Sequence, residues 1–138
     1  MDRLLELGLE SYAQGLISSH RFWDRPVVVF NTASFCGYTN QIASFQKLFL
    51  QGSIVPIALP TNEFGQQEPG DDYEIQQFLK TKYQVTFPIC MKTDLQHVIF
   101  QRHGKPTWNF NKYLFNKKHH FVDKFDSNFK PEDLISHV

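Results

Sequence analysis

The sequence predicts an α/β domain that has a central mixed sheet with helices on both faces. Val27–Phe30 is an unbroken apolar run, which is typical of a strand buried on both faces. Residues 39–51 place apolar side chains at helical spacing, and a second apolar run follows at residues 53–60. Two buried strands joined by a helix form a parallel unit.

The elements around this unit follow from local patterns. Residues 6–18, "ELGLESYAQGLIS", predict two short strands about a Gln-Gly turn, and residues 18–26 predict a loop or a single helical turn. In the helix over residues 39–51, Ile42, Phe45, Leu48 and Phe49 share one face, and Gly52 ends it.

The second half of the chain alternates loops, strands and helices. Residues 61–72 form a polar loop, and Asp71 or Asp72 caps the next helix, whose Ile75, Phe78 and Leu79 face inward. The later elements are a strand at 85–90, a strand at 108–115, a turn at 116–120, a strand at 121–125 and a closing helix at 131–138. This order is the thioredoxin-like plan, in one domain over residues 1–138.

Composition excludes several classes of function. The chain has 14 basic and 14 acidic residues, so no bulk positive field favours nucleic acid or an anionic membrane. No apolar run approaches the roughly 20 residues of a membrane span. The acids near the N-terminus argue against a secretory signal, and two cysteines are too few for a disulfide framework. We therefore expect a cytoplasmic protein without a membrane span.

Cys36 stands between the first buried strand and the following helix. Unpaired N–H groups at the start of a helix stabilise a thiolate, which is the reactive form of cysteine. The alternative is a small apolar residue that fills space. Thr39 occupies the place of the second thiol of a C-x-x-C motif, so Cys36 would pass its oxidation to another molecule or to a distant thiol. This favours attack of one thiolate on an electrophile such as a peroxide.

Four sequence blocks then resemble the glutathione peroxidase family, in family order, over residues 27–134. "NTASFCGYTNQ" is similar to its active-site stretch N-V-A-S-x-C-G-x-T, and "LPTNEFGQQEPGDDYEIQQF" to its F-P-C-N-Q-F-G-x-Q-E-P-G loop and helix. "WNFNKYLF" resembles its W-N-F-x-K-F-L signature, and "FKPEDL" its closing helix.

The resemblance implies an antioxidant peroxidase that reduces hydrogen peroxide or organic hydroperoxides and responds to oxidative stress. Its reactive residue would be Cys36, assisted by Gln67, Trp108 and Asn109. The two amides and the indole N–H are neutral donors that stabilise a thiolate and a departing oxygen. The reductant would be glutathione or a thioredoxin-like protein, with no metal or prosthetic group.

The chain departs from the family at several positions. Lys80 stands where many cysteine members carry a resolving cysteine, and the second thiol, Cys90, predicts a buried core residue. We therefore expect no intramolecular disulfide with Cys36. Glu63 replaces a usual Gln and is expected to face solvent or to pair with a basic residue. The segment 91–107 is short where relatives carry a helix and a longer loop, which implies a monomer and a more open site.

Two other functions remain open from the sequence. A thiol-based redox sensor or relay would use Cys36 but pass the oxidation to a protein partner. A binding module that has lost its activity would keep the fold alone, and Glu63 and the short segment would fit it. His119 and His120 do not suggest a metal site, since neighbouring residues on a hairpin point to opposite faces.

Overall fold

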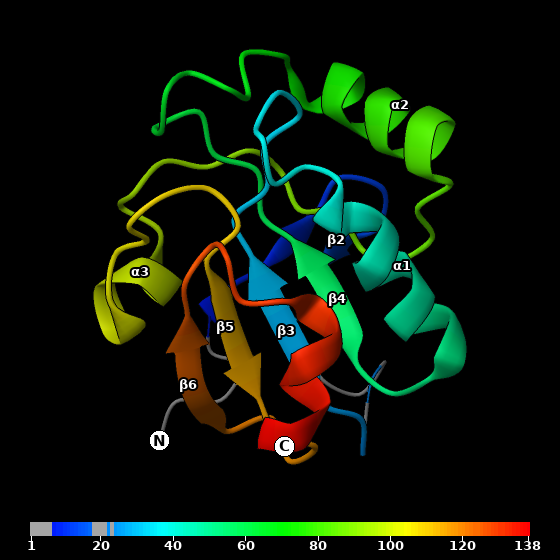
Figure 1. Cartoon of the computed structure of the whole chain (residues 1–138). Coiled ribbons are helices and arrows are strands. Elements are labelled where there is room, and N and C mark those ends of the chain that lie inside the picture. The colour runs from blue at the N-terminus through cyan, green and yellow to red at the C-terminus, as the bar shows by residue number, and fades with distance from the viewer. Residues whose placement is uncertain (1–6, 18–21, 23) are drawn as a thin grey trace.

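Four strands form the central sheet: β3 Val27–Phe30, β4 Val55–Ala58, β5 Lys112–Phe115 and β6 Phe121–Phe125. The computed structural model describes residues 7–17, 22 and 24–138. The strand order is β4-β3-β5-β6, with β4 parallel to β3 and the two later strands antiparallel to their neighbours (Figure 1). The predicted mixed sheet is confirmed.

Helices cover both faces of this sheet, as predicted. Helix α1 Gln41–Gln51 and the 3-10 helix Pro131–His137 pack on one face, whereas α3 Val98–His103 packs on the other (Figure 1). Helix α2 Asp72–Tyr83 lies beyond the carboxyl end of β4, near α1.

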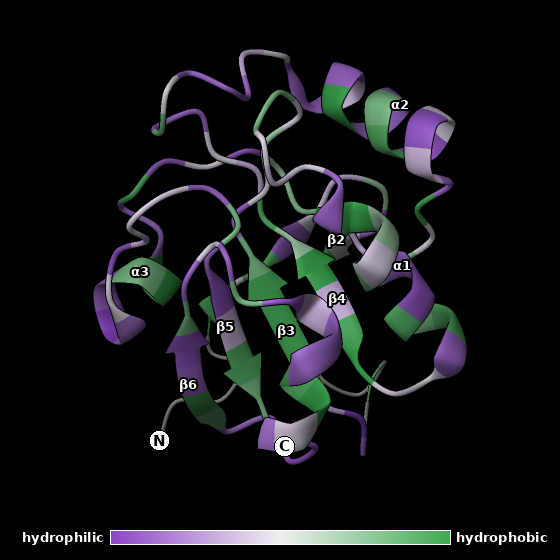
Figure 2. Ribbon diagram, in the orientation of Figure 1, coloured by the Kyte–Doolittle hydropathy of each residue, from purple (hydrophilic) through white to green (hydrophobic). Residues whose placement is uncertain are grey.

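Alternate residues of β3 enter two core clusters, one on each face of the sheet. Phe30 stacks on Phe45 of α1 with ring centroids 4.0 Å apart, and Val29 belongs to the cluster that contains Ile99 of α3. All four β3 side chains are buried, and Figure 2 shows the strand as hydrophobic along its length. Burial on both faces explains why the strand lacks polar alternation.

The two long helices have well-defined ends. Helix α1 begins at Gln41, two residues later than predicted, and Gly52 closes it with φ +74° and an N–H that donates to the Leu48 and Phe49 carbonyls. Asp71 is the residue that caps α2. Its carboxylate accepts the Glu74 N–H at 2.8 Å, and the Glu74 side chain accepts the Asp71 N–H at 3.1 Å.

The predicted N-terminal strand pair is confirmed as β1 Glu10–Ser11 and β2 Gly15–Leu16, which pair antiparallel. The loop or helical turn predicted for residues 18–26 lies largely outside the described residues. The closing helix is present at Pro131–His137, but it has 3-10 geometry.

The strand predicted at residues 85–90 is wrong. Only isolated bridges form there, between Ile89 and Ala58 and between Cys90 and Ser11. The Ala58 N–H donates to the Pro88 carbonyl at 3.0 Å, and the Cys90 N–H donates to the Ala58 carbonyl at 2.8 Å. Pro88 has no N–H of its own, so the ladder cannot extend along this segment.

No helix was predicted between residues 91 and 107, but the structure has one there. Helix α3 lies within this segment, and its first turn is capped by His97, whose Nδ1 accepts the Ile99 N–H at 3.2 Å. Across the described residues, every helix is too short or too polar to cross a bilayer.

Lys112 is fully buried at the start of β5, and its replacement by methionine is expected to destabilise the fold. Its Nζ donates to the carbonyls of Phe110, Asp126 and Ser127 at 2.8, 3.3 and 2.9 Å. Lys112→Met keeps the aliphatic chain but removes all three donors. We expect a loss of about 3 kcal/mol in the free energy of unfolding, measured by urea denaturation.

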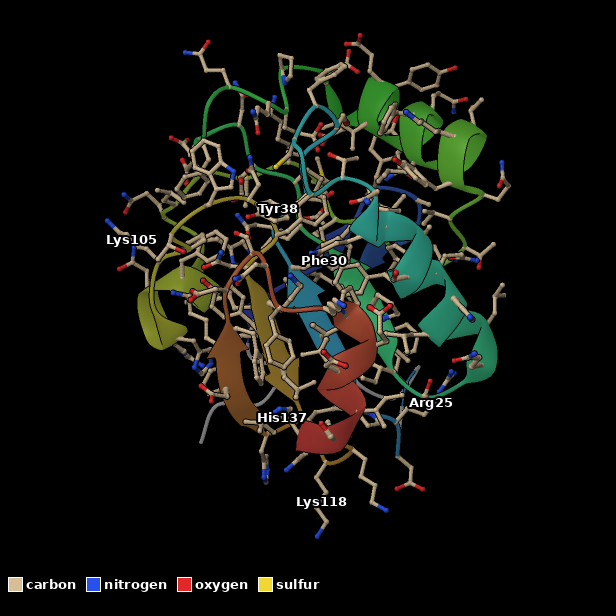
Figure 3. All side chains as sticks on the ribbon, in the orientation of Figure 1. Arg25, Phe30, Tyr38, Lys105, Lys118 and His137 are labelled. Carbon is tan, nitrogen blue, oxygen red and sulfur yellow. The ribbon has the colours of Figure 1, made fainter. Side chains whose placement is uncertain are left out.

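Lys105→Met is the matched control, because Lys105 is exposed and extends from the surface (Figure 3). It is expected to change stability by less than about 0.5 kcal/mol. Equal stabilities for the two variants would contradict the role given to the Lys112 ammonium.

Candidate active site

Cys36 lies in a series of turns between β3 and α1. The Thr39 N–H donates to the Cys36 carbonyl at 3.1 Å, and the Gln41 N–H donates to the Tyr38 carbonyl at 2.9 Å. The Cys36 side chain is 9% exposed. The thiol thus stands five residues before the first residue of α1, and not at the helix start that the sequence predicted.

A backbone donor nevertheless reaches the sulfur. The Tyr38 N–H lies 3.5 Å from Cys36 Sγ, and Tyr38 lies beyond Phe30, the last residue of β3 (Figure 3). The Cys36 N–H donates to Thr39 Oγ1 at 3.0 Å, and that hydroxyl donates to the Ala33 carbonyl at 2.9 Å. Thr39 therefore fixes the turn, and an N–H directed at sulfur stabilises negative charge there.

Gln67 and Asn109 are in direct contact although they come from different loops. Asn109 Nδ2 donates to Gln67 Oε1 at 3.1 Å and to the Phe64 carbonyl at 3.2 Å. Asn109 is fully buried, whereas Gln67 is half-buried. Because its oxygen is engaged by Asn109, the Gln67 amide keeps its Nε2 as a donor for a third group.

Trp108 lies against the same loop. A Cβ placed on Gly65, which has φ +65°, would come within 3.1 Å of Trp108 Cη2 and 3.4 Å of Gln67. The Trp108 ring also packs on Phe64, with centroids 5.7 Å apart, and the residue is 37% exposed. Gly65 thus allows the close approach of the indole to the Gln67 loop.

The strand predicted at residues 108–115 begins only at Lys112, so Trp108 and Asn109 lie in a turn. Phe110 has φ +63°, which is incompatible with an extended ladder. Asn31, directly after β3, holds this turn: its Nδ2 donates to the Trp108 carbonyl at 2.9 Å, and its Oδ1 accepts the Asn111 N–H at 2.9 Å.

The four predicted site residues thus lie in three loops at one end of the sheet, where β3 ends and β5 begins (Figure 1). The Phe35 N–H donates to the Gln67 carbonyl at 3.0 Å, which joins the loop of Cys36 to that of Gln67. None of the hydrogen bonds found among the described residues joins the Trp108 indole to the Cys36 sulfur. A hydrogen bond from the indole N–H to the Cys36 sulfur, which would need a distance within about 4 Å, stays a prediction.

Glu63 and Cys90 have the exposure that the sequence predicts. Glu63 is exposed, and so is Lys80 on α2. Cys90 is 2% exposed, and burial raises the pKa of its thiol to about 12. Within the described part of the chain, no three His, Cys, Asp or Glu side chains are grouped as metal ligands would be.

Cys36 and Cys90 are both free, buried thiols that belong to different core clusters. Cys36 belongs to the core cluster that contains Val28 and Phe30, whereas Cys90 belongs to the cluster that contains Val29. The two thiols therefore pack among different sets of core side chains. Cys36 is the thiol that has a backbone donor at its sulfur and amide groups in the adjoining loops, which suits nucleophilic attack on a small polar electrophile.

Comparison with known proteins adds independent information. The sequence model of one family, described as glutathione peroxidase, matches residues 5–112. The glutathione peroxidase homolog BsaA of Bacillus subtilis is 32% identical over 82% of this chain and 81% of that protein. The glutathione peroxidase-like peroxiredoxin gpx1 of Schizosaccharomyces pombe is 38% identical over 81% of each chain.

Two solved structures show the same fold. The crystal structure of T. cruzi GPX1 has a TM-score of 0.69 at 18% identity and covers 98% of this chain and 93% of that one. A thioredoxin-like protein from Aeropyrum pernix has a TM-score of 0.72 at 12% identity, over 94% and 88% of the two chains. The thioredoxin-like fold predicted from the order of elements is confirmed.

Proposed function

Because the chain belongs to the glutathione peroxidase family and is a thiol-dependent peroxidase, we propose that Cys36 is the thiol that attacks the peroxide. The observation that carries this assignment is the connected set of hydrogen bonds at the end of β3. Phe35, next to Cys36, donates to the Gln67 backbone, and Asn109 holds the Gln67 side chain. These contacts bring the thiol and the neutral amides to the same end of the sheet.

The reaction follows from this arrangement. The Cys36 thiolate attacks one peroxide oxygen, the O–O bond breaks, and the other oxygen leaves as water or an alcohol after it takes up a proton. Cys36 becomes a sulfenic acid. The Gln67 amide and the Trp108 indole supply uncharged N–H donors that hold the peroxide and stabilise the charge that develops on the leaving oxygen. Asn109 acts through Gln67, because both N–H groups of its amide are engaged by the Gln67 side chain and the Phe64 carbonyl.

The sulfenic acid is then reduced by two equivalents of an external thiol. The first thiol attacks the Cys36 sulfur and releases water, which leaves a mixed disulfide. The second attacks that disulfide, restores the Cys36 thiol and leaves the reductant oxidised. We propose glutathione or a thioredoxin-like protein in this role, and the burial of Cys90 in a different core cluster from Cys36 supports an external source.

A steady-state assay that compares the two reductants tests this proposal. With hydrogen peroxide as the substrate, one of them is expected to sustain many turnovers for each protein molecule. A relay would oxidise one protein partner and turn over with neither reductant alone. The similarity to peroxidases over most of the chain favours the enzyme over a relay or a binding module.

The short segment at 91–107 and the two free cysteines support a further proposal, that the enzyme acts as a monomer in a reducing compartment such as the cytoplasm.

Substitution of Gln67 tests whether its amide acts as a donor to the peroxide, and the neighbouring Gln66 provides a matched control. Gln67→Ala removes the amide that Asn109 orients, and we expect the rate constant for oxidation by peroxide to fall about 100-fold. Gln66 is exposed with φ +50°, a conformation that asparagine tolerates, so Gln66→Asn is expected to retain the wild-type rate. Stopped-flow tryptophan fluorescence measures both variants. Similar losses in the two would contradict the assignment of Gln67.

A further inference from the structure

Glu68 connects the two loops that carry the reactive thiol and its amide donor. Its Oε1 accepts the Ser34 N–H at 2.9 Å and also accepts the Ser34 hydroxyl. One residue along in each loop, the Phe35 N–H donates to the Gln67 carbonyl at 3.0 Å. Three hydrogen bonds therefore join Ser34–Phe35 to Gln67–Glu68, and we call this contact the clasp.

The clasp is held firmly on the Glu68 side. Glu68 is 1% exposed, and its own N–H donates to Asn62 Oδ1 at 2.9 Å. The side chain also lines a cavity of about 390 Å³ between Phe35 and the start of α2, whose walls include Ile75 and Phe78. The Glu68 carboxyl group is thus buried, and the backbone that carries it is held by Asn62.

Burying a carboxyl group costs free energy unless both of its oxygens find hydrogen-bond partners. Glu68 Oε2 is buried without a hydrogen-bond partner among the described residues. Burial raises the pKa of Glu68 to about 7, although the Ser34 hydrogen bonds and the charge of Lys92 act in the opposite direction. A proton on Oε2 leaves Oε1 able to accept both Ser34 donors, so the clasp persists in either charge state.

The position of the clasp suggests what it does for the reaction. Ser34 lies two residues before Cys36, and Glu68 directly follows Gln67. A shift of either loop would change the separation of the sulfur from the Gln67 amide, and small misplacements of reacting groups reduce rates strongly. We propose that Glu68 is a positioning residue that holds the Cys36 turn against the Gln67 loop, so that a peroxide meets the thiolate and the amide donor together. The proposal rests on the proposed function of Cys36 and Gln67.

The test compares two reactions of the same thiol in the full-length protein. Oxidation by hydrogen peroxide needs the amide donors, whereas alkylation by iodoacetamide needs only an accessible thiolate. Glu68→Ala is expected to slow oxidation by about 10- to 100-fold and to leave alkylation within about threefold of the wild-type rate. Equal losses in both reactions would mean that Glu68 acts on the thiol itself, which would overturn the proposal.

Two variants serve as references. Glu68→Gln keeps the Oε1 acceptor and is expected to restore oxidation to within about threefold of the wild-type rate. Glu74 also lines this cavity, but its carboxylate accepts the Asp71 N–H and makes no hydrogen bond to the clasp. Glu74→Ala is therefore expected to leave the rate of oxidation unchanged. If the oxidation rate of Glu74→Ala fell tenfold or more, loss of any carboxylate from this cavity would be enough to slow the reaction, which would contradict the proposal.

Ser34→Ala completes the design and remains informative if Glu68→Ala does not fold. It is expected to slow oxidation by at least about threefold on its own, and to add nothing to the loss in Glu68→Ala, because residues that act through one contact are not additive. Wild-type oxidation in Ser34→Ala, or additive losses in the double variant, would overturn the role of Glu68. An absence of oxidation at Cys36 in the wild-type protein would instead overturn the proposed function.

Discussion

The Cys36→Ser variant is expected to consume peroxide at least about 1,000-fold more slowly than the wild-type protein, in the presence of either reductant. A serine hydroxyl is not ionised at neutral pH and cannot form a sulfenic acid, so both halves of the cycle are lost. The turn itself should persist, since Thr39 holds it through backbone and hydroxyl contacts. Peroxide consumption coupled to thiol oxidation measures the loss.

Cys90→Ser is the control for this experiment. Cys90 is buried, and its thiol has a pKa raised to about 12, so it stays protonated and unreactive near neutral pH. The variant is expected to retain most of the activity, with some loss of stability from a hydroxyl placed in an apolar cluster. A Cys90→Ser variant as inactive as Cys36→Ser would place Cys90 in the mechanism.

The second large effect concerns the fate of oxidised protein when no thiol is supplied. A disulfide requires Cα atoms within about 7 Å, and Cys36 and Cys90 pack in different core clusters, each as a free thiol. Lys80, which the resemblance places at the position of a resolving cysteine, is exposed on α2 and has no thiol. We therefore expect turnover to stop after the first equivalent of peroxide, with the protein held as a sulfenic acid that excess peroxide converts to a sulfinic acid.

Intact-mass measurement separates these outcomes. The expected products carry one and then two added oxygens, and added glutathione diverts the first into a mixed disulfide. A loss of two hydrogens without added oxygen would contradict this expectation, because it would show that the chain resolves its own sulfenic acid.

The central strands could be predicted from the sequence because strands buried on both faces are apolar at successive positions. Val27–Phe30 is apolar without alternation because both its faces are covered. The wrong predictions concern segments whose secondary structure depends on tertiary contacts. Residues 85–90 read as a strand, yet Pro88 limits them to isolated bridges. Helix α3 escaped prediction because it has only six residues and an unusual cap from His97.

The sequence predicted which residues belong to the candidate site, but it did not predict the contacts among them. Cys36, Gln67, Trp108 and Asn109 were named from sequence blocks, and no local pattern indicated that Asn109 bonds Gln67. Asn31 and Glu68 were missed. A single carboxylate in a polar loop is ordinarily solvated, and only the packed structure shows that this one is buried. The one signal in the sequence for a role of Glu68 is its place directly after Gln67.

Identification of the first sulfur to be oxidised tests the central claim most directly. The wild-type protein is treated with one equivalent of hydrogen peroxide, trapped at once with a reagent specific for sulfenic acids, digested and mapped by mass spectrometry. We predict that the label lies on the peptide that contains Cys36, and that Cys90 remains an unmodified thiol. Label found first on Cys90, with Cys36 unmodified, would contradict the account.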